Sequence, residues 1–280
     1  MAKRHAAQHI GRNYIGGAGF MDAFLTLFGV NAAVILAILV VLWAISVAIK
    51  DVSFIDAFWG FSFVIIAAVT YLLTEGGSEE RRLLILCIAT VWGTRLAGYL
   101  FWRWRKEGPD KRYLAMLGKA EPHPHRFSFR MVFMLQGILL LIVSLPIQLG
   151  SIPAEPASVG ALGWFGAGLA IIGILFETIG DWQLARFKAR GTGGVMDQGL
   201  WRYTRHPNYF GDTCVWWGLY LIAAETTPGI ASFIGPAVMT YLLVKWSGAA
   251  LLERRLKRAK PEYEDYIRRT SGFFPWPPKG

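Results

Sequence analysis

The chain has 280 residues, of which 54% are hydrophobic and only 17% are charged. A soluble domain usually carries about a quarter charged residues, so this composition argues against a soluble protein and favours an integral membrane protein. The net charge of +10 sits in short segments between apolar runs, which disfavours nucleic acid as a partner and suits loops that face anionic lipid or a phosphorylated ligand.

Seven apolar runs approach the length of about 20 residues that crosses the hydrocarbon core of a bilayer. The first 20 residues hold no apolar core of the secretory type, so we expect the first run to remain as an anchor. The predicted spans are Phe24–Ile49, Phe54–Leu73, Leu83–Trp102, Val132–Leu149, Val159–Ile179, Gly211–Ala224 and Ile230–Val244, the last extending to about Leu252. The sixth span is short and rich in tryptophan. The sequence therefore predicts an all-α polytopic membrane protein, with seven transmembrane helices in a single domain over residues 1–280.

The distribution of lysine and arginine orients the predicted bundle. With seven spans, one side holds five basic residues, and the opposite side holds 22 of the 29. The five are Lys3, Arg4, Arg12, Arg81 and Arg82. Because basic loops remain in the cytoplasm, we expect a cytoplasmic C-terminus and an outside N-terminus, in the inner membrane if the protein is bacterial. A six-span arrangement would divide the basic loops between the two faces.

Three long polar segments fall on the predicted cytoplasmic side, and the one between Gly180 and Asp212 is the densest. Arginine forks suit phosphate, and flat rings suit a stacked purine or nicotinamide. The segment offers cations at Arg186, Lys188, Arg190, Arg202 and Arg205, rings at Trp201, Tyr203, His206 and Tyr209, and hydrogen-bonding groups at Asp181, Asn208 and Asp212. The glycines around Thr192 would allow close backbone approach, but they lack the context of a phosphate loop. By composition alone, an ordinary basic loop with interfacial aromatic residues remains an equal alternative.

The sequence RHPNY at residues 205–209 favours a built site over an ordinary loop. Pro207 fixes its own φ angle and pushes His206 toward an extended conformation. A tight turn would then present Arg205, His206, Asn208 and Tyr209 together just before an apolar helix.

At this point the chain resembles the steroid 5α-reductase-like superfamily of membrane enzymes, and most of all its bacterial branch of uncharacterised proteins. The resemblance covers most of the chain and is carried by Asp56-Ala-Phe-Trp59-Gly60, Trp92-Gly-Thr-Arg95-Leu, Asp110-Lys-Arg112-Tyr113, Gly180-Asp181, the stretch 199–209 and Tyr263-Glu-Asp-Tyr266. The RHPxY element also occurs in isoprenylcysteine and phospholipid methyltransferases, which use S-adenosylmethionine. The upstream elements at Asp56, Arg95 and 110–113 favour the reductases.

The resemblance implies an NADPH-dependent oxidoreductase that acts on a CH–CH group. Hydride would pass to the β-carbon of a lipophilic α,β-unsaturated ketone, as in a 3-oxo-4-ene steroid 5α-reductase. NADPH would bind in a cytoplasm-facing cavity formed by the C-terminal part, about residues 177–280. The implied cofactor residues are Glu177, Asp181, Arg186, Lys188, Trp201, Arg202, Arg205, His206, Asn208, Tyr209 and Asp212.

The implied reaction needs a donor at the enone oxygen, where negative charge develops as hydride arrives. In the steroid enzymes a glutamate and a tyrosine on the second and third membrane helices serve this purpose. Asp56 is the candidate for the carboxyl group, because a carboxyl group in an apolar span is costly and usually functional, although it could merely cap or pair near the interface. Trp92 takes the place of the tyrosine, and Tyr113 could supply the missing phenol. Arg95 could pair with Asp56, contact the cofactor or form a structural ion pair.

The expected partners are a lipophilic substrate from the bilayer and the membrane lipids, with no metal, no nucleic acid and no evident protein partner. Two other functions remain open. RHPNY together with Glu253 and Tyr263 would also suit a methyltransferase that uses S-adenosylmethionine. A non-enzymatic lipid-binding or transport protein is the second alternative, although transport would not require such a cluster of loop residues.

Overall fold

The computed structural model describes residues 17–191, 193–246 and 248–279, and every regular element in these ranges is helical. The elements are α2 (Gly17–Ile49), α3 (Ile55–Leu73), α4 (Glu79–Glu107), α5 (Lys111–Gly118), α6 (Pro124–Ser128), η1 (Phe129–Met134), α7 (Leu135–Val143), α8 (Leu145–Ser151), α9 (Ala161–Ala189), η2 (Gly199–Arg202), α10 (Pro207–Ala223), α11 (Thr227–Ile230), η3 (Ala231–Phe233), α12 (Ile234–Tyr241), η4 (Leu242–Trp246), α13 (Ala249–Ala259) and α14 (Tyr263–Arg269). The all-α prediction is confirmed for this part of the chain. Lys3, Arg4, Arg12 and Thr192 lie outside the described residues.

Six helical segments within these ranges are long and apolar enough to cross a membrane. They are Gly19–Ile49, Ile55–Leu73, Glu79–Glu107, Pro124–Val143, Ala161–Ala189 and Thr227–Trp246. By length and composition the chain is therefore an integral membrane protein. The sixth predicted span corresponds to α10, which has 17 residues and falls just short of this length. The count of seven spans thus remains a prediction.

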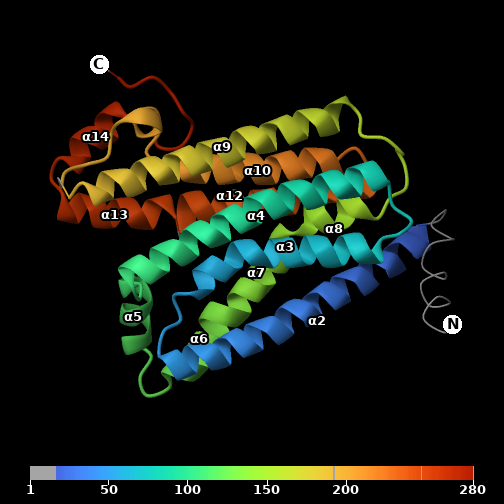
Figure 1. The fold of residues 1–280 in the computed structure, drawn as a ribbon, viewed down its shortest axis with the longest axis horizontal. Coiled ribbons are helices and arrows are strands. Elements are labelled where there is room, and N and C mark those ends of the chain that lie inside the picture. The colour runs from blue at the N-terminus through green and yellow to red at the C-terminus, as the bar shows by residue number, and fades with distance from the viewer. Residues whose placement is uncertain (1–16, 192, 247, 280) are drawn as a thin grey trace.

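The long helices run side by side along one axis, and α5, α13 and α14 gather at one end of the bundle (Figure 1). We call this the basic end, because α4 and α9 bring the cations of residues 103–112 and 186–190 to it. The opposite end holds the connection from α3 to α4 and the start of α9 (Figure 1). The polar segments singled out in the sequence are therefore collected at a single end of the molecule.

Glycines hold α10 tightly along α9. A Cβ atom placed on Gly211 would lie 2.5 Å from the carbonyl oxygen of Gly173, and one on Gly218 would lie 2.5 Å from that of Gly166. Small residues let helix backbones approach closely in membrane proteins, where apolar burial between helices contributes little. This packing fixes the start of α10, which carries RHPNY, against the last turns of α9.

Several helix boundaries differ from the sequence prediction, and two of these differences have a clear physical reason. The fifth predicted span ends at Ile179, but α9 continues to Ala189, so Asp181 and Lys188 lie on a helix and not in a loop. The residues beyond Ile179 are mostly good helix formers, and hydropathy alone could not show that the helix continues past the apolar run. The fourth predicted span is interrupted at Ser144, because Pro146 has no N–H group to continue the helical hydrogen bonds.

Candidate functional site

A cavity of about 700 Å³ lies at the basic end, and helices from both halves of the chain form its walls. Asp56 and Arg103 line it from α3 and α4, while Asn208 and Tyr209 line it from α10. Lys260 contributes from the segment between α13 and α14. The volume falls in the range of about 300–1,000 Å³ that is typical of small-molecule and cofactor sites. The cavity brings residues of the upstream and downstream motifs of the sequence analysis into one place.

The RHPNY segment forms part of the wall as its proline predicts. Pro207 begins α10, and His206 before it has a non-helical φ of −140°. The side chains of Arg205, His206, Asn208 and Tyr209 all line the cavity. The rings of His206 and Tyr209 lie parallel, with centroids 5.4 Å apart. The turn therefore presents these four side chains together, on a rigid helix start.

The guanidinium group of Arg205 is already hydrogen-bonded within the protein. Its Nε donates a hydrogen bond of 2.8 Å to Glu253, and its Nη1 donates to the carbonyl oxygens of Thr270 and Ile267, at 2.7 and 3.2 Å. His206 Nε2 lies 2.9 Å from the same oxygen of Glu253. Arg205 thus joins the start of α10 to α13 and α14.

Glu253 is the acidic centre of this junction. Burial alone would raise its pKa, but hydrogen bonds from His206 and Arg205 and the positive charge of Arg205 outweigh that effect and lower the pKa to about 2. The ordinary value is 4.5. The ion pair therefore stabilises the fold fully above pH 4.5, and this contribution is lost as the pH falls toward 2.

Removing Arg205 should loosen the junction. We expect Arg205→Ala to lower the free energy of unfolding in detergent by about 2–4 kcal/mol, since it leaves a half-buried carboxylate and two carbonyl groups without their donor. Thermal melting and limited proteolysis near residues 267–270 would measure the effect. Arg202→Ala, at an exposed position three residues earlier, is the matched control. Equal melting of the two variants would contradict the assignment.

A second polar cluster lies behind the cavity wall, around Arg95. Its guanidinium group lies 2.8 Å from Glu177 and 2.8 Å from Asp181. The indole of Trp92 donates a hydrogen bond of 2.8 Å to Glu177, and Asn208 donates one of 3.2 Å to Asp181. Only Asn208 among these five residues lines the cavity.

This cluster bears on three expectations from the sequence. Trp92 is fully buried and bonded to Glu177, so it does not face the cavity as the donor that its place in the motif suggested. Arg95 pairs with Glu177 and Asp181, so of the three alternatives left open for it the structure shows the ion pair. Glu177, Asp181 and Asp212 are buried behind the wall, and Asp212 Oδ1 has no hydrogen-bond partner among the described residues. A buried helix contacts its neighbours on several sides, and the sequence alone could not show which side lines the cavity.

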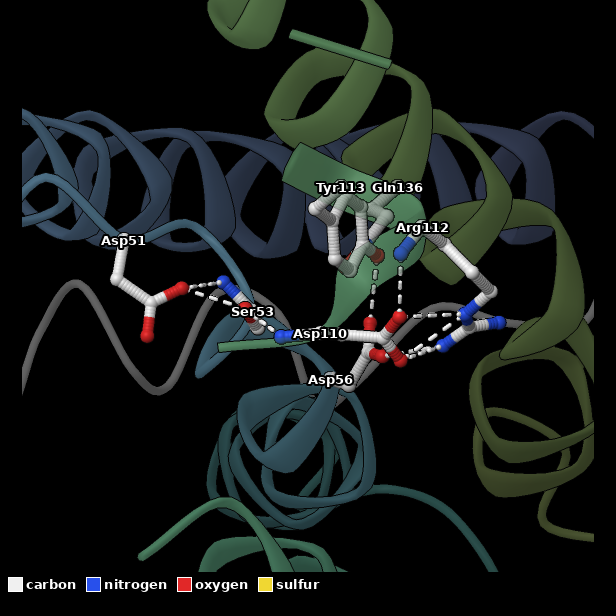
Figure 2. A network of polar contacts seen from close by, with 7 residues as sticks. All are labelled: Asp51, Ser53, Asp56, Asp110, Arg112, Tyr113 and Gln136. Atoms are coloured by element: carbon white, nitrogen blue, oxygen red, sulfur yellow. Dashed lines mark hydrogen bonds and ion pairs between the residues drawn. The ribbon is translucent and has the colours of Figure 1, made fainter. Parts of the chain in front are cut away.

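Asp56, which lines the cavity, belongs to a third cluster of polar contacts (Figure 2). The hydroxyl of Tyr113 donates a hydrogen bond of 2.7 Å to Asp56 Oδ1, and Gln136 donates one of 3.4 Å to that hydroxyl. Arg112 Nη2 lies 3.4 Å from Asp56 and 2.8 Å from Asp110. The surroundings of Asp56 are therefore polar, whereas the sequence suggested a carboxyl group in an apolar pocket.

The start of α5 positions this cluster. Asp110 caps the helix by accepting a hydrogen bond of 2.7 Å from the backbone N–H of Arg112. Burial and the neighbouring charge of Asp56 raise the pKa of Tyr113 above its ordinary value, so the phenol stays protonated at neutral pH. Tyr113 is not among the residues that line the cavity, and it reaches the cavity only through Asp56.

Residues 42–270 match the model of a family described as protein of unknown function DUF1295. The chain belongs to this family. It is also similar to the Uncharacterized protein C594.04c of Schizosaccharomyces pombe, with 23% identity over 264 residues that cover 84% of this chain and 76% of that protein. No solved structure matches. The DUF1295 match includes all three polar clusters described above.

The remaining predicted residues of this DUF1295 chain divide into two groups. Trp201 and Lys188 line the cavity, the first with its indole donating to the carbonyl of Gly180 and the second paired with Glu107 at 3.2 Å. Arg186 and Arg202 are exposed and do not line it, and Arg186 lies over the ring of Trp182. The sequence therefore named more cations than the cavity uses.

The sequence analysis missed several cavity residues. Arg103, Lys111, Lys260 and Tyr266 all line the cavity. Arg103 follows Arg95 by eight residues on α4, and a spacing of two helical turns places both on the same face. Arg95 does not line the cavity, so this spacing alone could not have assigned Arg103 to it.

Proposed function

We propose that this protein is a membrane reductase that uses NADPH to reduce the C=C bond of a lipophilic α,β-unsaturated ketone. The observation that carries the proposal is the shared cavity, which unites Asp56 with the side chains of RHPNY. The resemblance of these motifs to the steroid 5α-reductase-like enzymes supports the same function. The basic end would face the cytoplasm, with α10 as the sixth of seven spans.

The cavity fits a dinucleotide by volume and by chemistry. Its wall offers amide and phenol groups at Asn208 and Tyr209, flat rings at His206 and Trp201, and several cations. Asn208 is held in place by Asp181, which is in turn held by Arg95, so the cofactor wall has a rigid support. His206, Asn208 and Tyr209 would hold the cofactor, which when bound would supply the hydride.

The substrate carbonyl would lie at the end of the cavity formed by Asp56 and Arg112, which both line it. As hydride adds to the β-carbon, electrons move onto the carbonyl oxygen, and a proton then adds to the α-carbon. Preorganised donors at that oxygen stabilise the developing charge. Tyr113 would hold the Asp56 carboxyl group in place through its hydrogen bond, and Asp110 would hold Arg112 in place through their ion pair.

One experiment separates this proposal from its alternatives. The purified protein in detergent is titrated with NADPH and with S-adenosylmethionine, and the consumption of NADPH is then followed with a panel of lipophilic enones. We expect NADPH to bind and to be oxidised only when an enone is present. Binding of S-adenosylmethionine alone would overturn the proposal. Binding of lipids without any consumption of NADPH would favour a non-enzymatic protein.

A membrane methyltransferase is the second candidate, and one observation favours it. Glu253 is bonded to both Arg205 and His206, and Tyr263 lines the same cavity, so the residues that suggested this alternative do lie together. In such an enzyme the Asp56 cluster would have no place in the chemistry. Substitution of Asp56 should then leave S-adenosylmethionine turnover unchanged.

A further inference from the structure

Six basic side chains line the cavity, and four of them are already engaged by the protein. Arg112 is held by Asp110, Lys188 by Glu107, Arg205 by Glu253, and Lys260 by the carbonyl oxygen of Gly194. The other two, Arg103 and Lys111, make no hydrogen bond or ion pair to any residue that the structure describes. Among these six cations, they are the ones left available to a ligand.

Arg103 lines the cavity within electrostatic reach of several titratable groups. Its charge acts on Asp56 and Asp110 at one side and on Asp181 and Tyr209 at the other. It is half-buried at the end of α4, where its guanidinium group has lost part of its contact with water. A guanidinium group in such a place gains more from an anionic ligand than an exposed one does, because the local dielectric is lower.

The protein holds the two free cations in fixed positions. The indole of Trp104, next to Arg103, donates a hydrogen bond of 2.7 Å to Asp51. Asp51 accepts from the backbone of Ser53 at 2.8 Å, and the hydroxyl of Ser53 accepts from the backbone of Asp110 at 2.8 Å (Figure 2). This chain of bonds ties the end of α4 to the start of α5, where Lys111 is the first residue.

The turn between the two helices depends on one glycine. Gly108 ends α4 with φ of +72°, a conformation that side-chain-bearing residues rarely adopt. It reverses the chain so that Lys111 returns to the wall that already contains Arg103. The two cations therefore line the same cavity from the two sides of a built turn and do not belong to a freely solvated loop.

We propose that Arg103 and Lys111 form a subsite for a diphosphate ester in the cavity. Two free cations match a group with two negative charges, and the planar fork of arginine suits bidentate contact with phosphate oxygens. The inference rests on the proposed function, in which the diphosphate is the bridge of the dinucleotide. The same chemistry occurs in a lipid diphosphate, so the test includes both sources.

The test compares Arg103→Gln with Arg105→Gln, a control that removes an exposed arginine two residues later that does not line the cavity. Binding of ADP-ribose, NADPH, NADH and farnesyl diphosphate is measured by calorimetry on the purified protein, after melting curves show that both variants are folded. We expect Arg103→Gln to weaken ADP-ribose binding by about 10- to 100-fold, and NADPH and NADH by the same factor. Lys111→Gln should weaken all three by about fivefold, and Arg105→Gln should change none.

The possible outcomes separate the subsite from the proposed reduction. If NADPH binds and is consumed but Arg103→Gln matches Arg105→Gln, the subsite is wrong and the reduction stands. If farnesyl diphosphate alone binds, and Arg103→Gln abolishes it, the subsite stands and the reduction fails. If Arg103→Gln loses affinity for NADPH but not for NADH, Arg103 binds the 2′-phosphate and the diphosphate assignment is overturned. If the wild-type protein binds none of the four ligands, both the subsite and the proposed reduction are overturned.

Discussion

The variant Asp56→Asn should retain its affinity for NADPH and lose turnover by about 10²- to 10³-fold, the usual effect of removing a group that stabilises charge in the transition state. Asparagine keeps the size of the side chain, but it can neither carry charge nor share a proton with the substrate oxygen. Stopped-flow oxidation of NADPH with a lipophilic enone gives the turnover, and calorimetry gives the affinity. Asp22→Asn changes an exposed carboxylate on α2 and is the matched control.

Two outcomes would revise this view of Asp56. Full activity of Asp56→Asn would remove the residue from the mechanism, and an equal loss of NADPH affinity would assign it to cofactor binding. Tyr113→Phe adds a second comparison, because Tyr113 acts through Asp56 and should lower turnover less, by about tenfold. If the two residues act as a unit, the double variant should be no worse than Asp56→Asn alone. A shifted pH profile in Tyr113→Phe would show that the phenol tunes the carboxyl group and does not merely support the fold.

The largest loss of stability is expected from Arg95→Met. This change leaves Glu177 and Asp181 buried without their shared cation. Removing one partner of a buried ion pair typically costs about 3–5 kcal/mol, because the remaining charge is uncompensated. Thermal melting of the purified protein in detergent measures the change, and the cofactor affinity should fall with it, since Asp181 holds Asn208 in the cavity wall.

The matched control for Arg95→Met is Arg105→Met, which removes an exposed arginine from the same helix. The double variant Arg95→Met with Asp181→Asn should recover part of the lost stability, because one of the two uncompensated charges is then gone. An unchanged melting temperature in Arg95→Met would show that the cluster around Arg95 is not the structural support of the cavity.

The sequence predicted the membrane helices well where charged residues mark their ends. The second predicted span, Phe54–Leu73, differs from α3 by one residue at its start, and Phe24–Ile49 shares its end with α2. Hydropathy fails where a helix leaves the apolar region without stopping, as α9 does after Ile179. It also gives no warning of the break at Ser144, where an isolated proline interrupts an apolar run.

The candidate site was only partly predictable, for a different reason. The turn at Pro207 is a local effect, so RHPNY could be placed at a helix start from sequence. The neighbours of Asp56 and Arg95 depend on how distant helices rotate about their axes, and no local pattern records that. The same rotation decided that Trp92 faces Glu177 and that Arg103 faces the cavity. The sequence therefore showed whether a polar residue is buried more readily than it showed which residue it contacts.

The junction between Arg205 and Glu253 has a consequence for how the protein is made. Thr204 also donates to the carbonyl of Phe273, and the backbone N–H of Trp276 donates to the carbonyl of Tyr203. Because the ribosome synthesises the chain from its N-terminus, the C-terminal partners in these bonds emerge only after the apolar helices. During biosynthesis the bundle can thus enter the lipid before the cavity is complete, and the C-terminal segment closes the cavity as one of the last steps of folding.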